Sequence, residues 1–191
     1  MLLTDRFSLI VLGLTLGAQL MRRSFLVHSI KYIWRIAALG YFVLSVYWSW
    51  ALYEAWQGNS LMRFVLPPYN SDWNYYISKV AVDIFGPWVI ALVVGVAFGL
   101  FAHYMNARSG ERFFEKEEIP ILALGIFLTG YPGFLFYIFF VLFAAIFQSL
   151  YYTARGKGRA PLYYFWLPLA ILAIIIKNWL LPQDFLSQFK L

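Results

Sequence analysis

The sequence predicts an all-α protein, a polytopic transmembrane helical bundle of about six spans. Hydrophobic residues make up 62% of the 191 positions and charged residues only 13%, whereas soluble domains are about half apolar and about a quarter charged. The mean hydropathy is +0.69, and apolar runs close to the length of a membrane helix recur between basic stretches. A globule of this size has too little interior to bury so much apolar surface. An integral membrane protein is therefore indicated.

Charge and cysteine content exclude several other classes. The chain has no cysteine, which rules out disulfides, thiol catalysis and cysteine-type zinc sites. A net charge of +6 in a membrane protein orients the chain and attracts anionic lipid. No nucleic-acid-binding pattern accompanies that charge, so the lipid bilayer is the partner we expect.

Six apolar segments define the predicted spans. The first is followed by Arg22 and Arg23 where a signal peptide would have a small-residue cleavage site, which favours a retained anchor. As one straight helix, the stretch 119–152 would be about 51 Å long against a hydrocarbon core of about 30 Å. The turn signal GYPG at 130–133 divides it into two spans. The predicted spans are 7–21, 36–53, 84–105, 114–129, 133–152 and 161–181.

The basic residues predict the orientation of this single transmembrane domain, 1–191. With six spans, ten of the 15 Lys and Arg residues fall on one side and five on the other. The positive-inside rule assigns the richer side to the cytoplasm. The loops 106–118 and 153–160 are then cytoplasmic, whereas 54–83 is an extracytoplasmic loop and both termini lie outside. The membrane that this rule describes is the bacterial or archaeal cytoplasmic membrane.

Two spans carry glycines at the GxxxG spacing that lets helices approach closely. Gly13 and Gly17 lie in the first span, and Gly95 and Gly99 lie in the third. Either pair is a candidate contact for a membrane protein partner or a homo-oligomer. In 54–83, the aromatic residues around WNYY have two interpretations, a stacking surface for a ligand or, the one we favour, an interfacial belt.

The charged stretch GERFFEKEEIPILALG, residues 110–125, poses the main functional question. Glu117 and Glu118 directly precede Ile119 and Pro120, and proline suits a first helical turn. Acidic side chains there are stabilised by the helix dipole, which favours a structural role. The alternative is a glutamate at the membrane boundary that exchanges a proton. No hydrolase, nucleotide or metal motif occurs elsewhere, and the two histidines have no carboxylate at helical spacing, so we predict no cofactor and no metal.

The order of parts from Asp83 to Leu180 resembles the C-terminal half of the type IV prepilin peptidases. These intramembrane aspartyl proteases have an apolar helix, a basic loop, and a Gly-x-Gly-Asp-x-Lys motif that opens the next helix before an ALG continuation. Aligning ALG, 123–125, with the family places Glu117 at the catalytic aspartate and Lys116 at the second glycine. Neither motif glycine is present here. The matching segments are DIFGPWVIALVVGVAFGLFAHYMNARSG, FFEKEEIPILALGIFLTGYPG and RGKGRAPLYYFWLPLAILA.

The resemblance implies a carboxylate pair, with Glu117 as one catalytic candidate and Glu54 as the best match for the family's other aspartate. Glu118, the next residue of the acidic cluster, is a further candidate. Two carboxylates activate water only when they lie within a few Å of each other. The predicted topology puts Glu54 and Glu117 on opposite faces of the membrane, so Glu54 qualifies only if the topology differs. We therefore predict a non-catalytic scaffold or accessory subunit. The alternative is a divergent intramembrane carboxylate peptidase that processes prepilin-like substrates at the cytoplasmic face. A transporter is disfavoured because no ionisable residue lies deep within a predicted span.

Overall fold

The computed structural model is all-helical, as the composition predicts, and the residues it describes are 3–21, 23–67, 73–110, 114–115, 117–156 and 162–180. Within these residues, four helices are long and apolar enough to cross a membrane, and two apolar helices are shorter. These four helices indicate an integral membrane protein. The helices are α1 (Leu3–Met21), α2 (Arg23–Gln57), α3 (Asn74–Lys79), α4 (Gly86–Arg108), α5 (Glu118–Thr129), α6 (Gly133–Ala154) and α7 (Trp166–Ile175).

Two of the long helices extend well beyond the predicted spans. Helix α2 covers 35 residues, where the apolar pattern indicates only 36–53. The π-helical turn Val80–Phe85 joins α3 to α4, so one helix runs from Asn74 to Arg108 and the stretch 54–83 is helical at both ends. Hydropathy marks only the part of a helix that suits hydrocarbon, whereas backbone hydrogen bonding continues through polar residues. The Lys79–Asp83 ion pair, four residues apart at 2.5 Å, is one such polar extension.

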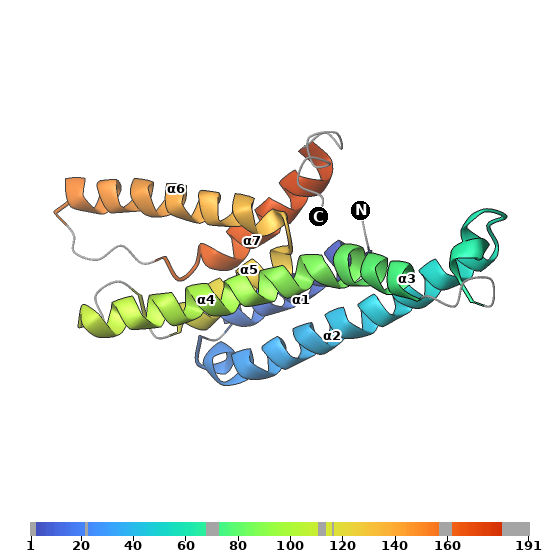
Figure 1. Ribbon diagram of the computed structural model, residues 1–191. Helices are drawn as coiled ribbons and strands as arrows, with labels where there is room; N and C mark the ends of the chain where they lie inside the picture. Colours follow the sequence, from blue (N-terminus) through green and yellow to red (C-terminus); the bar gives the residue numbers. More distant parts are fainter. Residues whose placement is uncertain are drawn as a thin grey trace.

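The GYPG turn predicted at 130–133 is confirmed. Helix α5 ends at Thr129 and α6 begins at Gly133. Gly130 has φ +62° and ψ 169°, a conformation that glycine adopts readily and other residues avoid. The turn reverses the chain, and α6 runs back along the bundle (Figure 1).

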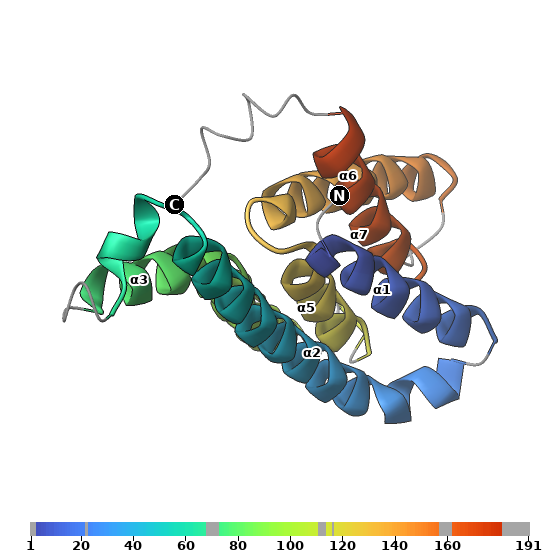
Figure 2. The same ribbon diagram turned by 90° about the vertical axis from the view of Figure 1, so that its right-hand side faces the viewer.

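Helix α5 lies at the centre of the bundle. It contacts α1, α2, α4, α6 and α7, and Figure 2 shows it enclosed by its neighbours. Every residue from Ile121 to Thr129 is buried. Its 12 residues span only about 18 Å, less than the hydrocarbon core of about 30 Å. A short helix is tolerated at membrane depth when protein and not lipid surrounds its ends.

Of the two predicted glycine pairs, Gly95/Gly99 contacts another helix, whereas Gly13/Gly17 meets no other described residue. A Cβ atom added to Gly95 would come within 2.9 Å of the Ala123 carbonyl oxygen, and one added to Gly99 would lie 3.5 Å from the Ala123 Cβ. This pair therefore packs α4 against α5 inside the chain. A Cβ atom on Gly13 or Gly17 would meet nothing within 4 Å among the described residues.

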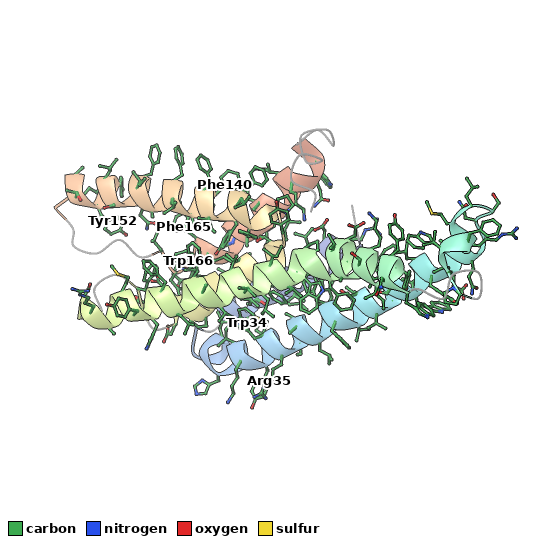
Figure 3. All side chains as sticks on the ribbon, in the orientation of Figure 1. Trp34, Arg35, Phe140, Tyr152, Phe165 and Trp166 are labelled. Carbon is green, nitrogen blue, oxygen red and sulfur yellow. The ribbon has the colours of Figure 1, made fainter. Side chains whose placement is uncertain are left out.

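Helix α2 packs on α5 through aromatic side chains. The Trp34 ring stacks on Phe127 at a centroid distance of 5.3 Å, and its Nε1 donates a hydrogen bond to the Pro120 carbonyl at 3.1 Å. Figure 3 shows Trp34 pointing into the bundle, while Arg35, the next residue, points away from it. One face of α2 therefore packs on protein, while the opposite face is exposed.

Candidate functional site

The acidic cluster is built into the start of α5. Glu118 is buried with 2% of its surface exposed. Its Oε2 accepts a hydrogen bond from the Glu115 backbone N–H at 3.0 Å, and the Glu118 N–H donates to the Glu115 carbonyl at 2.9 Å. These two hydrogen bonds close the turn that leads into α5 and satisfy one of its backbone donors. The Glu118 carboxylate therefore has a structural task in the fold.

Helix α4 anchors the segment that leads into this helix start. The Asn106 Oδ1 accepts a hydrogen bond from the Phe114 backbone N–H at 3.0 Å, and Asn106 is itself buried. The half-buried Glu117 occupies the position directly before α5. Both glutamates thus lie beside the C-terminal end of α4.

Glu54 lies at the other end of the bundle. It is exposed near the end of α2, in a stretch where Tyr53 stacks on Trp73 at 6.0 Å and the Tyr76 hydroxyl donates to the Ser49 carbonyl at 2.6 Å. The continuous helix from Asn74 to Arg108 separates the two places, and the 30 residue-to-residue steps from Tyr76 to Asn106 span about 45 Å. The structure brings Glu117 and Glu118 together and does not bring Glu54 to them.

The aromatic residues of 54–83 pack mainly on one another and on α2. Trp56 stacks on Tyr75 at 5.8 Å, and Tyr76 makes edge contacts with Tyr53 and Trp56 at 5.9 and 5.7 Å. These contacts, with Tyr53 stacked on Trp73, join the end of α2 to α3. They account for the aromatic enrichment without a ligand. Within the described part of the chain, no three His, Cys, Asp or Glu side chains gather as a metal site would need.

A buried ion pair forms where the sequence indicates nothing. The Lys177 Nζ lies 2.6 Å from the Asp5 Oδ1, and the side chains are 12% and 6% exposed. The Lys177 amino group, close to the end of a predicted span, points inward to a carboxylate on α1. The two residues are 172 positions apart, so no local spacing connects them.

A second polar network lies about one turn along α1 from this ion pair. The Ser8 Oγ lies 2.6 Å from the Tyr41 hydroxyl oxygen, and the Tyr41 hydroxyl donates to the Leu128 carbonyl at 3.2 Å. Ser8 and Tyr41 are both buried. The network links α1 and α2 to the C-terminal end of α5, where backbone carbonyls lack helical partners.

The ion pair and Tyr41 line a cavity of about 510 Å³. It lies between α1, the second half of α2, the start of α4 and the GYPG turn. Most of its wall is apolar or aromatic, with charged groups at two places. The lining residues are Thr4, Asp5, Tyr41, Ser45, Trp48, Ala51, Leu52, Ala55, Lys79, Asp83, Ile84, Pro87, Trp88, Thr129, Gly130, Tyr131 and Lys177.

Two polar atoms of lining residues are buried without a hydrogen-bond partner among the described residues. They are the second carboxylate oxygen of Asp5, Oδ2, and the indole Nε1 of Trp88. The first is an acceptor and the second is a donor. Both atoms have almost no accessible surface, so neither is open to the space of the cavity, although other atoms of the two residues line it.

The chain was compared with models of known protein families, with curated proteins and with solved structures, and none of the three comparisons gave a match. Two features therefore stand as candidate sites. One is the acidic start of α5 at one end of the bundle, and the other is the mostly apolar cavity with its buried ion pair at the other end.

Proposed function

We propose that the chain is a non-catalytic scaffold or accessory subunit of a membrane assembly, with the helix order of prepilin-peptidase-like proteins. The placement of its carboxylates carries this proposal. The Glu118 carboxylate already accepts a hydrogen bond from the Glu115 backbone N–H. Glu54 and Glu117 lie at opposite ends of the helix Asn74–Arg108. A carboxylate peptidase needs two such groups within a few Å.

The proposal includes an embedded position in a bacterial or archaeal cytoplasmic membrane. Large apolar side chains are exposed along α2, α4 and α6, among them Phe42, Val93, Phe139 and Phe147 at 52%, 61%, 60% and 59%. Such surface suits lipid tails. The Gly13/Gly17 face of α1 stays a predicted contact for a membrane partner, whereas α5 already covers Gly95.

Single-cysteine labelling tests the orientation. Glu54 lies near the start of the Asn74–Arg108 helix, where Tyr53 stacks on Trp73. Tyr131 lies further along it, where its N–H donates to the Pro87 carbonyl at 3.3 Å, and Glu117 lies beside its other end. In the cysteine-free chain, we expect cysteines at Glu54 and Tyr131 to react with an impermeant thiol reagent on intact cells. A cysteine at Glu117 should react only after lysis. Equal labelling of the Glu54 and Glu117 positions would contradict the predicted topology.

The glutamate variants test whether the protein is catalytic. We expect Glu117→Gln, introduced in the native host, to support the same growth and the same membrane assembly as the unaltered chain. Glu118→Gln keeps an acceptor oxygen and should change stability little, whereas Glu118→Ala should lose about 1 kcal/mol, the usual net contribution of one hydrogen bond. Thermal unfolding of the purified protein measures the change in stability of Glu118→Gln and Glu118→Ala.

A divergent intramembrane peptidase is the competing outcome of this experiment. It predicts that the Glu117→Gln strain resembles a deletion strain although the folded protein accumulates normally, and that an uncleaved precursor builds up in its membranes. A scaffold predicts instead that deletion alone reduces the amount of a co-purifying membrane complex, while the Glu117→Gln strain retains it.

A further inference from the structure

We propose that the exposed face of α2 binds one anionic phospholipid, with the head-group phosphate at Lys31 and Arg35 and an acyl chain along the apolar residues that follow. This site goes beyond the proposed scaffold role, because it depends on the membrane position of the chain and not on the absence of catalysis. The position of the two cations, the tyrosine that they share and the length of the apolar surface beside them support the proposal.

The two cations lie on one face of α2, near its start. Successive residues of an α-helix are rotated by about 100° around its axis, so residues three or four apart share a face. Lys31, Tyr32 and Arg35 are all exposed, and Figure 3 shows Arg35 pointing away from the bundle. Trp34, in contrast, stacks on a residue of α5. The two cations therefore face the surroundings of the bundle and not its interior.

Tyr32 holds the two cations next to each other. The Lys31 Nζ lies 5.1 Å from the centroid of the Tyr32 ring, and the Arg35 Cζ lies 5.9 Å from it. Such cation–π contacts position each cation without neutralising it. Like charges four residues apart on a helix repel each other, and neither cation forms an ion pair with an acidic side chain in the described part of the chain. A bound anion would relieve that repulsion.

A phospholipid head group supplies the anion that fits this pair. A guanidinium group binds two phosphate oxygens at once, and an ammonium group adds a compact positive charge. Basic residues at the end of a transmembrane helix attract anionic lipid, above all in the cytoplasmic leaflet, which this end of α2 faces under the predicted topology. A zwitterionic lipid carries a cation of its own beside the phosphate. The pair Lys31 and Arg35 therefore favours an anionic lipid over a zwitterionic one.

The same face of α2 continues as an apolar stripe that suits an acyl chain. Leu39, Val43 and Val46 follow Arg35 at helical spacing and are 64%, 56% and 49% exposed. The rise from Arg35 to Val46 is about 16 Å, close to half of a hydrocarbon core of about 30 Å. A lipid with its phosphate at Arg35 would thus lay one acyl chain along the stripe over the depth of a single leaflet.

The test measures binding of phosphatidylglycerol to the full chain in a non-ionic detergent, with phosphatidylcholine of the same acyl chains for comparison. Native mass spectrometry gives the equilibrium constant for the first lipid bound. We expect the first phosphatidylglycerol to bind roughly tenfold more tightly than the first phosphatidylcholine, since a hydrogen bond to a charged group contributes at least that much. Glycerol 3-phosphate at equal concentration should not displace the lipid, because it lacks the acyl chain that contacts the stripe.

Two double variants with the same change in net charge are compared. Lys31→Gln with Arg35→Gln removes the paired cations, and binding of the two lipids should then differ by no more than about twofold. Arg108→Gln with Arg155→Gln removes two exposed cations that each lie beside a tyrosine of their own, and should keep the preference. Tyr32→Phe keeps the ring beneath the cations and should also keep it, whereas Tyr32→Leu should weaken it about two- to fivefold.

Three results would overturn the proposal. One is the absence of a preference for phosphatidylglycerol in the unaltered chain, which is expected if this face binds an acidic protein segment. Another is a preference that both double variants keep, or that both lose equally, although both remain folded by circular dichroism. The third is displacement of the lipid by glycerol 3-phosphate, which indicates a soluble phosphate ligand. The scaffold role is tested separately by the glutamate variants, and its failure would leave these results unchanged.

Discussion

Lys177→Met is expected to destabilise the folded protein by about 3–5 kcal/mol, the usual cost of removing one partner from a buried ion pair. The Lys177 amino group lies 2.6 Å from Asp5, whose side chain is 6% exposed. Without its counter-charge the carboxylate, whose side chain is almost fully buried, stays uncompensated. Asp5→Leu should have an effect of similar size for the complementary reason. Unfolding in mixed detergent micelles measures both losses.

The double variant Asp5→Leu with Lys177→Met is the decisive control. Replacing both members of a buried pair by apolar side chains is often neutral or stabilising, so the double variant should be clearly more stable than either single variant. The outer pair, Lys79 and Asp83, is partly exposed, and its removal should change stability little. Should the double variant be as unstable as the sum of the single ones, Asp5 and Lys177 would not be coupled in the folded protein.

Phe127→Ala is expected to destabilise the bundle by about 3 kcal/mol, the lower end of the range for phenylalanine in a protein core. Phe127 has no exposed surface and contacts the rings of Trp34 and Tyr41 at 5.3 and 5.2 Å. In a membrane, lipid tails solvate the separated helices as well as leucine does, so the cost comes from lost packing and not from transfer to water. The free energy of unfolding in detergent measures this loss.

Phe143→Ala is the matched control for that substitution. Phe143 lies on α6 with 55% of its surface exposed, and its ring contacts are with Phe139 and Phe147 of the same helix. Its removal opens no internal cavity and should change stability by less than about 0.5 kcal/mol, as for most surface positions. A loss as large as that of Phe127→Ala would contradict the central position of α5.

Much of the fold could be predicted because local chemistry decides it. The chain is helical and apolar since a backbone in lipid must satisfy its hydrogen bonds internally. The GYPG signal ends α5 at Thr129 because Gly130 adopts a positive φ that interrupts a helix. The glutamates before Ile119 start α5, with Pro120 in its first turn. The positions where helices end were predicted less well. Polar residues such as Lys79 and Asp83 lie within a helix, but they give no apolar pattern from which the helix could be recognised.

The sequence by itself therefore determined the class of the protein, its helical segments, the reversal at 130–133 and the acidic helix start, since each depends on interactions among residues a few positions apart. Only the tertiary structure decided that α5 is the buried centre, that Gly95 packs on Ala123, and that Asp5 meets Lys177 beside a cavity. These contacts join residues far apart in the chain. A buried charge pair or a cavity depends on how the helices pack. Hydropathy and residue spacing along one helix do not indicate which other helix it will pack against.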